Sequence, residues 1–357
     1  MIITIDCRHF DYSGIGVYIR GCLPYFLDSG NFFYLIGNPE KLQSVIEGYK
    51  NVEILDYRSR PFSLEELFFF PRKHLLKINK GDLFLSPYFN IPNGITVPVY
   101  TTIHDIIFPD MSEIVSWVGL QLRMYFYRRA FAKSKKIFTV SEFSKSRIEH
   151  YSRGRVPVTV TYNAIQPWVQ EWKRNGKKIE KNNTIVFVGN IKRHKGLDYF
   201  LEAFLLAKAE GLPHQLVIIG NKNNLRSSNS AFSKKLDSLD PDIAYFTGFV
   251  ANEKLIDYLS SAALLVQPSL YEGFGLPPLE AMVLGTQTLI SDIPAFKEIF
   301  NDFPVVFFRT GNVMDLKEKL LDLLLNKPAK TLSLPEHLLS KYTFKRTASI
   351  MLENMVP

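Results

Sequence analysis

Two glutamates flank a short loop rich in glycine, phenylalanine and proline in the second half of the chain. Seven residues separate Glu272 from Glu280, and those at 273–278 read Gly-Phe-Gly-Leu-Pro-Pro. Gly273 and Gly275 leave backbone amide groups uncovered, so that a sugar or a diphosphate could approach the main chain closely. The residue types and their spacing indicate a ligand-binding loop with a carboxylate at each end. The alternative is structural, since a Pro-Pro helix start with a nearby glutamate is common.

The flanking residues predict a strand before this loop and a helix after it. Residues 263–267 form a short apolar run that is typical of a buried parallel strand. Residues 277–285 predict a helix with proline in its first turn and glycine after its end. Glu272 should therefore lie on the loop at the carboxyl end of a strand. Glu280 should fall in the first turn of the helix, where the helix dipole favours a negative charge.

A second candidate for anion chemistry is the basic loop at residues 189–196, Gly-Asn-Ile-Lys-Arg-His-Lys-Gly. It follows an apolar run at 184–188 and precedes a helical pattern at 197–210. Backbone amides, the helix dipole and cationic side chains all favour an anion at a helix start. We therefore expect this loop, with Arg193 and Lys195, to suit a diphosphate; a solvated basic turn is the alternative.

Two further candidates lie in the first half of the chain. Gly14 and Gly16 stand between a β-branched run at 2–6 and a helical pattern, as in a phosphate cradle, although Ile19 replaces the third glycine of the dinucleotide fingerprint. His104 directly follows another apolar run, and ligands bind at the carboxyl ends of strands in open parallel sheets. A structural turn and a structural histidine are the respective alternatives.

Length and composition favour a globular protein of two domains. The chain has 357 residues, of which 46% are hydrophobic and 22% charged, enough for each half to bury its own core. Cys7 and Cys22 fall in the expected first strand and first helix, which indicates reduced core thiols and a cytoplasmic compartment. No apolar segment is long enough to cross a bilayer, so we expect a soluble or peripheral protein. A net charge of +8 indicates an anionic partner, which could be a nucleotide diphosphate, an acidic membrane surface or nucleic acid. The alternative is a generally basic surface without such a partner.

One segment combines aromatic and basic residues. Residues 64–80 contain three consecutive phenylalanines together with Arg72, Lys73, Lys77 and Lys80. This composition suits a helix that lies on a membrane surface, and it equally suits a core helix with a solvated edge.

The order of apolar runs and helical patterns predicts the architecture. Strand-like runs alternate with helical or loop segments throughout, which is typical of a parallel sheet covered on both faces. The predicted fold class is α/β, with two doubly wound, Rossmann-like domains. We expect a first domain at 1–165, a polar, lysine-rich linker at 166–183, a second domain at 184–340 and a terminal helix at 341–357.

The Glu-x7-Glu pattern around Gly-Phe-Gly-Leu-Pro closely resembles the signature of retaining glycosyltransferases of the GT-B fold, in the large family 4, or group 1. The resemblance covers nearly the whole chain and continues in Ser13-Gly-Ile-Gly, in His104-Asp105 after a strand, and in Lys195-Gly196. In that family the last helix crosses back to the first domain. The sequence departs from the family at Asn190, where an arginine is usual, so Lys192 or Arg193 would have to supply that cation.

The resemblance implies two domains that face each other across a cleft and the transfer of a hexose from a nucleotide-diphosphate sugar, with retention at the anomeric carbon. The implied acceptor is a hydroxyl of a glycan or a lipid-linked glycan. Glu272 would hold sugar hydroxyls, Lys195 the diphosphate and Glu280 the ribose, and His104 would contact the donor sugar. The catalytic residues would be Glu272, His104 and Lys195. The implied donor-binding set is Gly14, Gly16, Asn190, Arg193, Lys195, Val250, Gly273, Phe274, Gly275, Leu276 and Glu280.

Similarity of two glycine segments to mannosyl and rhamnosyl transferases of O-antigen pathways favours GDP-mannose as the donor and a role in cell-surface polysaccharide biosynthesis. The family implies no metal ion and no cofactor besides the nucleotide sugar. We expect a cytoplasmic protein, with peripheral contact to anionic lipid at the inner face of the membrane as an option. A nucleic acid partner is not expected.

Two other functions stay open at this point. A nucleotide-sugar epimerase of the same architecture would lack the Glu-x7-Glu motif, so the sequence speaks against it. A catalytically inactive protein that binds a nucleotide sugar or nucleic acid is consistent with Asn190. The intact Glu272, Glu280, Lys195 and His104 favour an active enzyme instead.

Overall fold

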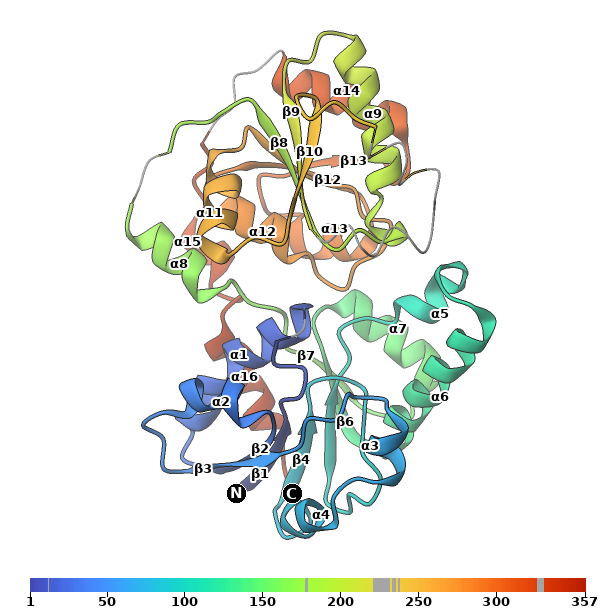
Figure 1. The fold of residues 1–357 in the computed structure, drawn as a ribbon, viewed down its shortest axis with the longest axis vertical. Helices are drawn as coiled ribbons and strands as arrows, with labels where there is room; N and C mark the ends of the chain where they lie inside the picture. The colour runs from blue at the N-terminus through green and yellow to red at the C-terminus, as the bar shows by residue number, and fades with distance from the viewer. Residues whose placement is uncertain (12, 177–178, 221–231, 233–235, 237, 326–330) are drawn as a thin grey trace. The chain divides into compact units, whose positions relative to one another are not determined.

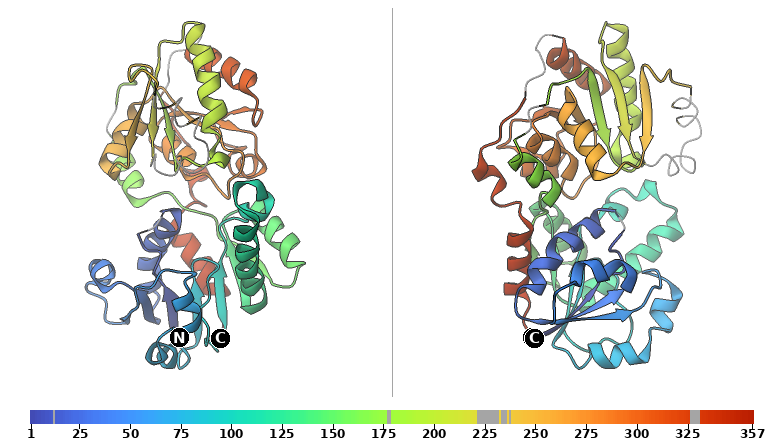
Figure 2. Two further views of the ribbon diagram at one scale, coloured as in Figure 1. Left: turned by 45° about the vertical axis from the view of Figure 1, so that its right-hand side comes forward. Right: turned by 60° about the vertical axis from the view of Figure 1, so that its left-hand side comes forward.

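The chain divides into two compact units (Figure 1). The computed structural model describes residues 1–357 except 12, 177–178, 221–231, 233–235, 237 and 326–330. Unit 1 comprises Met1–Ala164 and Lys341–Pro357, and unit 2 comprises Ile165–Ser340. The end of the chain therefore returns to the first unit, and each unit is built on a parallel sheet of its own (Figure 2).

Unit 1 contains a sheet of seven parallel strands in the order β3-β2-β1-β4-β5-β6-β7. The strands are β1 (Ile2–Asp6), β2 (Phe32–Gly37), β3 (Val52–Asp56), β4 (Leu83–Ser86), β5 (Val99–Thr102), β6 (Ser134–Thr139) and β7 (Val158–Val160). Their buried residues are mainly aliphatic and aromatic, as expected where helices cover both faces of a sheet. The order along the sheet reverses at β1, so the carboxyl ends of β1 and β4 form a topological switch point.

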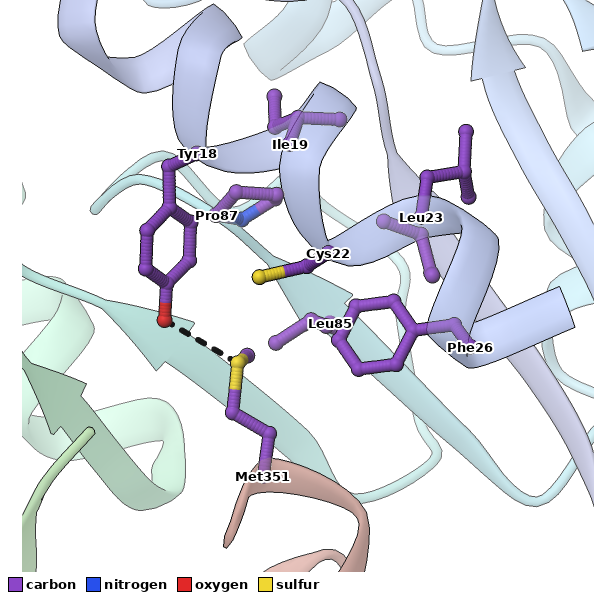
Figure 3. A pocket seen from close by; sticks show the side chains of 9 residues that line it. Tyr18, Ile19, Cys22, Leu23, Phe26, Leu85, Pro87 and Met351 are labelled. Atoms are coloured by element: carbon purple, nitrogen blue, oxygen red, sulfur yellow. Dashed lines mark hydrogen bonds between the residues drawn. The ribbon is translucent and has the colours of Figure 1, made fainter. Parts of the chain in front are cut away.

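Helices from both ends of the chain cover the sheet of unit 1. They are α1 (Ser13–Leu27), α2 (Pro39–Ile46), α3 (Leu64–Phe68), α4 (Arg72–Ile78), α5 (Ile107–Asp110), the 3-10 turn η1 (Ser112–Ile114), α6 (Trp117–Lys133), α7 (Glu142–Ser152) and α16 (Phe344–Asn354). The terminal helix α16 packs against α1 very closely, because a Cβ atom at Gly21 would lie 2.3 Å from the Phe344 ring. Beside a small apolar cavity under α1, the Tyr18 hydroxyl donates to Met351 Sδ at 3.1 Å (Figure 3). These contacts fasten the C-terminal helix to the first unit.

Unit 2 contains a sheet of six parallel strands in the order β10-β9-β8-β11-β12-β13. The strands are β8 (Thr184–Val188), β9 (Gln215–Ile219), β10 (Ala244–Gly248), β11 (Leu264–Gln267), β12 (Gln287–Ser291) and β13 (Val306–Phe308). The order reverses between β8 and β11, and the loops that follow these two strands therefore meet at a switch point. Both loops were singled out by their sequences.

The helices of unit 2 bury large aromatic side chains against this sheet. They are α8 (Pro167–Arg174), the 3-10 turn η2 (Arg193–Lys195), α9 (Leu197–Ala209), α11 (Asn252–Ser261), α12 (Leu276–Val283), α13 (Pro294–Phe300), α14 (Val313–Leu324) and α15 (Glu336–Leu339). Phe187 of β8 packs with Phe200 and Phe204 of α9 in the main core cluster, and all three are fully buried. Burial of this size anchors the loop between β8 and α9 at both ends.

The linker prediction is wrong at its start. Residues 167–174 of the expected linker 166–183 form helix α8, which packs against α12 within unit 2. Proline at the first helical position sets the backbone angle for a helix. Val169 is buried and Trp168 is half-buried, so an apolar side of this polar, lysine-rich stretch holds it on the unit.

The predicted fold class is confirmed: both units are doubly wound α/β layers around parallel sheets. Cys7 and Cys22 are free and buried, and burial raises the pKa of each thiol. None of the described helices is long and apolar enough to cross a lipid bilayer.

Candidate functional site

An ion pair joins the two loops at the switch point of unit 2. Lys195 Nζ lies 2.5 Å from Glu272 Oε1, and the two side chains are 20% and 14% exposed. Lys195 ends the turn η2 after β8, and Glu272 follows β11, the neighbouring strand. Since ligands bind open parallel sheets at such reversals, the pair occupies the expected position for a ligand site. Partial exposure leaves both groups accessible to that ligand.

Hydrogen bonds from buried groups fix one oxygen of Glu272. Ser269 Oγ donates to Glu272 Oε1 at 2.8 Å, and Gln267 Nε2 donates to Ser269 Oγ at 3.0 Å. The Ser269 carbonyl in turn accepts a hydrogen bond from Ser291 Oγ at 2.5 Å. Within the described residues, no hydrogen bond reaches Glu272 Oε2. The carboxylate is therefore oriented through Oε1, while Oε2 is able to accept a hydrogen bond from a ligand hydroxyl.

Further hydrogen bonds connect the loop after β11 to the loop after β8 and to helix α9. Leu270 N donates to the His194 carbonyl at 2.7 Å, and the Tyr199 hydroxyl donates to the Pro268 carbonyl. Gly196 lies between the two loops with φ +67, and a Cβ atom there would be 2.0 Å from Pro268 O. Only glycine satisfies both the left-handed backbone and this close approach. This packing thus fixes the positions of Lys195 and Glu272 relative to each other.

The glycine turn before α12 is packed in the same way. Gly275 has φ +111, and its Cβ atom would lie 2.6 Å from the Phe296 ring. Gly273, Phe274 and Gly275 are buried, whereas Leu276 is half-buried and begins α12. Because the Phe274 side chain is buried, a ligand would meet the backbone of the turn.

Glu280 lies deeper and further along the helix than expected. Because α12 already begins at Leu276, Glu280 is past its first turn, and the expected placement in the first turn is wrong. The residue is 6% exposed, and burial raises the pKa of its carboxyl group to about 8. Among the described residues its carboxyl group has no hydrogen-bond or ion-pair partner. A buried and unpartnered acid of this kind is typical of a site that a ligand completes.

The other predicted donor-site residues of unit 2 lie at different places relative to the Lys195–Glu272 ion pair. Asn190 and Arg193 are exposed on the loop after β8. The start of this loop packs closely against Gly220, because a Cβ atom at Gly220 would lie 2.0 Å from the Gly189 carbonyl oxygen. Val250 follows the edge strand β10, with β9 between that strand and β8. Asn190 and Arg193 thus share a loop with Lys195, whereas Val250 lies toward the sheet edge.

The remaining predicted residues, Gly14, Gly16 and His104, belong to unit 1. His104 Nε2 lies 3.1 Å from the Pro87 carbonyl oxygen, which can only accept, so Nε2 carries the proton. Burial lowers the pKa of His104 to about 4, although its hydrogen bond to Pro87 opposes the shift. The ring is therefore neutral near pH 7, and Nδ1 is an acceptor. His104 lies after β5, next to Tyr18 of α1 at 5.0 Å between ring centroids.

The glycines of unit 1 are inside the first turn of a helix, whereas the sequence indicated a turn before it. Helix α1 begins at Ser13, so Gly14 and Gly16 are helical. A Cβ atom at Gly16 would lie 2.3 Å from the Phe10 carbonyl oxygen, while at Gly14 there is open space. Gly16 thus has a packing reason to be glycine, and Gly14 leaves the helix start accessible.

Sequence reasoning missed a buried charged network at the switch point of unit 1. Arg8 Nη2 contacts Asp6 Oδ2 at 2.6 Å and Glu66 Oε1 at 2.8 Å. Asn90 Nδ2 donates to the same two oxygens at 3.0 and 2.9 Å. Burial alone would raise the pKa of Asp6, but the charge and hydrogen bonds of Arg8 bring it below its ordinary value. The only sign of this network in the sequence was an arginine two residues after the end of a strand. Its partner Glu66 lies 58 positions away in the sequence.

In the described part of the chain, no group of three or more His, Cys, Asp or Glu side chains could hold a metal ion. Asp240-Pro-Asp242 has the spacing of a metal-binding Asp-x-Asp motif. In the structure Asp240 Oδ1 accepts from Asp242 N at 2.9 Å, which closes a turn before β10. That turn precedes the amino end of β10, and Lys195 and Glu272 follow the carboxyl ends of their strands.

Residues 169–338 match the family model described as "Glycosyl transferases group 1". This range includes both loops of the switch point. Unit 2 is a group 1 glycosyl transferase domain. The family predicted from the Glu-x7-Glu pattern is therefore confirmed.

Curated relatives of this chain include two bacterial proteins named as mannosyltransferases. The chain is 28% identical over 207 residues to the O-antigen chain mannosyltransferase RfbU of Salmonella typhimurium, covering 56% of this chain and 54% of that protein. It is 36% identical over 111 residues to the serotype-specific mannosyltransferase WbdA of Escherichia coli, covering 30% of this chain and 13% of that protein. The alignment with RfbU thus spans about half of that relative.

Solved structures share the fold of the entire chain. Anabaena HepE in complex with UDP and glucose has a TM-score of 0.69 at 15% identity, covering 99% of this chain and 98% of that chain. Sucrose-phosphate synthase of Thermosynechococcus elongatus has a TM-score of 0.71 at 17% identity, with the same coverage. Both units together therefore have the GT-B fold. The roles of the individual residues stay predictions.

Proposed function

We propose that this protein is a retaining glycosyltransferase that moves a hexose from a nucleotide-diphosphate sugar to a hydroxyl of a glycan or lipid-linked glycan. The observation that carries the proposal is the Lys195–Glu272 pair at the switch point of a group 1 domain. One loop supplies a cation for the diphosphate and the adjacent loop a carboxylate for the sugar. The two groups that a nucleotide sugar needs are thus within one site.

In the proposed reaction the bond between the anomeric carbon and the diphosphate oxygen breaks, and a bond from the acceptor oxygen to the same carbon forms. The acceptor's proton passes to the leaving phosphate. Negative charge develops on the diphosphate, so preorganised cations and amides lower the barrier most. Lys195 supplies that charge, with Arg193 and the amides of the loop at Gly189 beside it. Glu272 accepts from sugar hydroxyls through Oε2.

Glu280 suits the ribose in this proposal. Its carboxyl group is largely protonated near neutral pH, because burial raises its pKa to about 8. A neutral acid does not repel a diphosphate, and it both donates to and accepts from hydroxyl groups. The ribose hydroxyls would complete a group that lacks a partner among the described residues.

In unit 1 we assign His104 to the donor sugar, with Nδ1 as the acceptor. Gly14 at the start of α1 leaves backbone amides open to the pyrophosphate. Unit 1 would also bind the acceptor. No step of this scheme uses a metal ion or a cofactor besides the nucleotide sugar.

We propose GDP-mannose as the donor and cell-surface polysaccharide biosynthesis as the setting, because RfbU and WbdA are named as mannosyltransferases. The protein would work in the cytoplasm, with peripheral contact to anionic lipid at the inner face of the membrane. Such a location would bring it to a lipid-linked acceptor.

A thermal-shift panel tests the proposal. The full chain is screened against GDP, UDP, dTDP and ADP with their sugar conjugates, against a short RNA, and with and without a chelator. We expect one nucleotide family to raise the unfolding temperature and the chelator to change nothing. Stabilisation by RNA alone would contradict a glycosyltransferase function and favour a protein that binds nucleic acid. A lack of stabilisation by every nucleotide sugar would also contradict the proposal.

A further inference from the structure

The outer flank of unit 1 exposes large apolar side chains on two helices. Phe68 of α3 and the adjacent Phe69 are 69% and 74% exposed. On α6, Trp117, Val118, Leu122 and Tyr125 are 52–74% exposed. We call these six residues the α3–α6 surface. Solvated helices normally present polar residues outward, and exposed apolar groups in such number mark an interaction site.

Several contacts show that α3 and α6 are neighbours. The rings of Phe62 and Phe126 lie 4.7 Å apart between centroids and connect the start of α3 to the middle of α6. Arg129 of α6 donates to Asn93 Oδ1 at 2.6 Å, and Asn93 Nδ2 donates to the Leu67 carbonyl of α3 at 2.6 Å. Both helices lie on the same flank of unit 1 (Figures 1 and 2). Their exposed residues therefore belong to one region of the molecule.

The buried charged network holds α3 in place. Glu66 of α3 accepts from Arg8 at 2.8 Å and from Asn90 at 2.9 Å, and its other oxygen accepts from Phe62 N. Ser63 caps the helix through Glu66 N at 3.1 Å. Phe62 has a left-handed backbone with φ +65, a conformation that costs free energy in a non-glycine residue. The fold thus maintains a strained turn that leaves Phe68 and Phe69 outside the core.

Positive charge surrounds the α3–α6 surface. Helix α6 contains four cationic residues and no acid, and the adjoining α4 likewise carries no acid. Arg72, Lys73, Arg128 and Lys133 are exposed, and none of them forms an ion pair with a described residue. Among the described residues of α3, α4, η1 and α6, the exposed acids are Glu65 and Glu113. Cations therefore predominate around the apolar residues.

We propose that the α3–α6 surface docks on an anionic lipid membrane. The phenylalanines would enter the boundary between headgroups and acyl chains, Trp117 and Tyr125 would lie at headgroup level, and the cations would contact lipid phosphates. A second copy of the chain fits less well, because a symmetric contact would bring the same cations face to face. The proposal gives the membrane contact of the proposed function a definite surface, and its observations do not depend on the transferase activity.

Vesicle sedimentation tests the proposal directly. The full chain is mixed with vesicles of phosphatidylcholine alone or with 30% phosphatidylglycerol, without any nucleotide. We expect binding to the anionic vesicles, and a loss of about tenfold or more in Phe68→Ser/Phe69→Ser and in Trp117→Ser/Leu122→Ser. Charge reversal in Arg72→Glu/Lys73→Glu should also weaken binding. The controls, Met314→Ser on α14 and Lys254→Glu on α11 of unit 2, change exposed residues and should bind as the wild type does.

Two outcomes would overturn the proposal. One is equal binding by the wild type and the variants of the α3–α6 surface. The other is a concentration-dependent dimer in light scattering that Phe68→Ser/Phe69→Ser abolishes, which would assign the surface to a second copy. Nucleotide binding by unit 2, measured without vesicles, should be unchanged in all these variants. A failed vesicle assay with normal nucleotide binding would thus reject the membrane surface alone, whereas the reverse would reject the proposed function alone.

Discussion

Lys195 Nζ and Glu272 Oε1 lie 2.5 Å apart where the loops after β8 and β11 meet. Each group is assigned to a different end of the donor: the cation to the diphosphate and the carboxylate to the sugar. A nucleotide sugar would therefore bind beside a pair that is already formed. Since Ser269 shares the same oxygen of Glu272, the second oxygen stays available to the sugar.

Removal of the carboxylate should abolish most of the activity. We expect Glu272→Ala to lower turnover by ~100-fold or more, because a preorganised contact to the reacting sugar is lost. The turnover rate is measured as the release of the nucleoside diphosphate. Glu253→Ala, an exposed acid in the first turn of α11, is the control and should retain wild-type turnover. Full activity in Glu272→Ala would remove this residue from the chemistry.

Ser269 should act as a positioning residue for Glu272. Ser269→Ala removes the hydroxyl that orients Oε1, and we expect turnover to fall by roughly tenfold, with a stability loss of about 1 kcal/mol. Ser260→Ala removes another buried hydroxyl of unit 2, which donates to the Ile256 carbonyl at 2.7 Å. This control should lose similar stability and no turnover. If both variants keep full turnover, Ser269 has only a structural role.

Gly196 should tolerate no side chain. Gly196→Ala adds a left-handed alanine and a Cβ atom 2.0 Å from the Pro268 carbonyl oxygen, so the loops must separate. We expect a loss of more than about 2 kcal/mol, together with weaker nucleotide binding. Gly211→Ala has a comparable backbone strain, with φ +96, but no atom within 4 Å. Thermal unfolding should therefore show a distinctly smaller loss there, and an equal loss in both variants would contradict the close contact.

Glu280 should make stability depend on pH. Its pKa rises from the ordinary 4.5 to about 8 in the folded protein, so the folded state holds a proton that the unfolded state releases. Stability should therefore fall as the pH rises between these two values. Glu280→Gln should stabilise the protein on the order of 1 kcal/mol or more at pH 8 relative to pH 5, measured by thermal unfolding. Glu253→Gln is the exposed control, and a similar pH profile for Glu280→Gln and the wild type would contradict the shift.

The sequence predicted the strands of both sheets well, because short runs such as residues 185–188 are continuously apolar and mark buried parallel strands. The placement of Glu272 and Lys195 was also accessible, since each lies on the loop that follows such a run. The contact between Lys195 and Glu272 was not accessible from the sequence, because 77 positions separate them and only the strand order brings the two loops together.

Other features depend on tertiary structure. Glu66 resembles a helix-surface acid in the sequence, and its burial against Arg8 follows from the return of a distant segment to the end of β1. The burial of Glu280 depends on a helix that starts at Leu276, and boundaries of this kind are poorly defined by residue type. Helix α8 was missed because lysines around it obscure its apolar side.

The central claim is that Lys195 binds the diphosphate of a nucleotide sugar beside Glu272. The most direct test is calorimetric titration of the full chain with the nucleoside diphosphate that the thermal-shift panel selects. We predict that Lys195→Ala weakens binding by about tenfold or more, since a charge-assisted contact to phosphate is lost, while Lys254→Ala on α11 binds as the wild type does. Equal affinity in all three proteins would contradict the assignment of the diphosphate to this site.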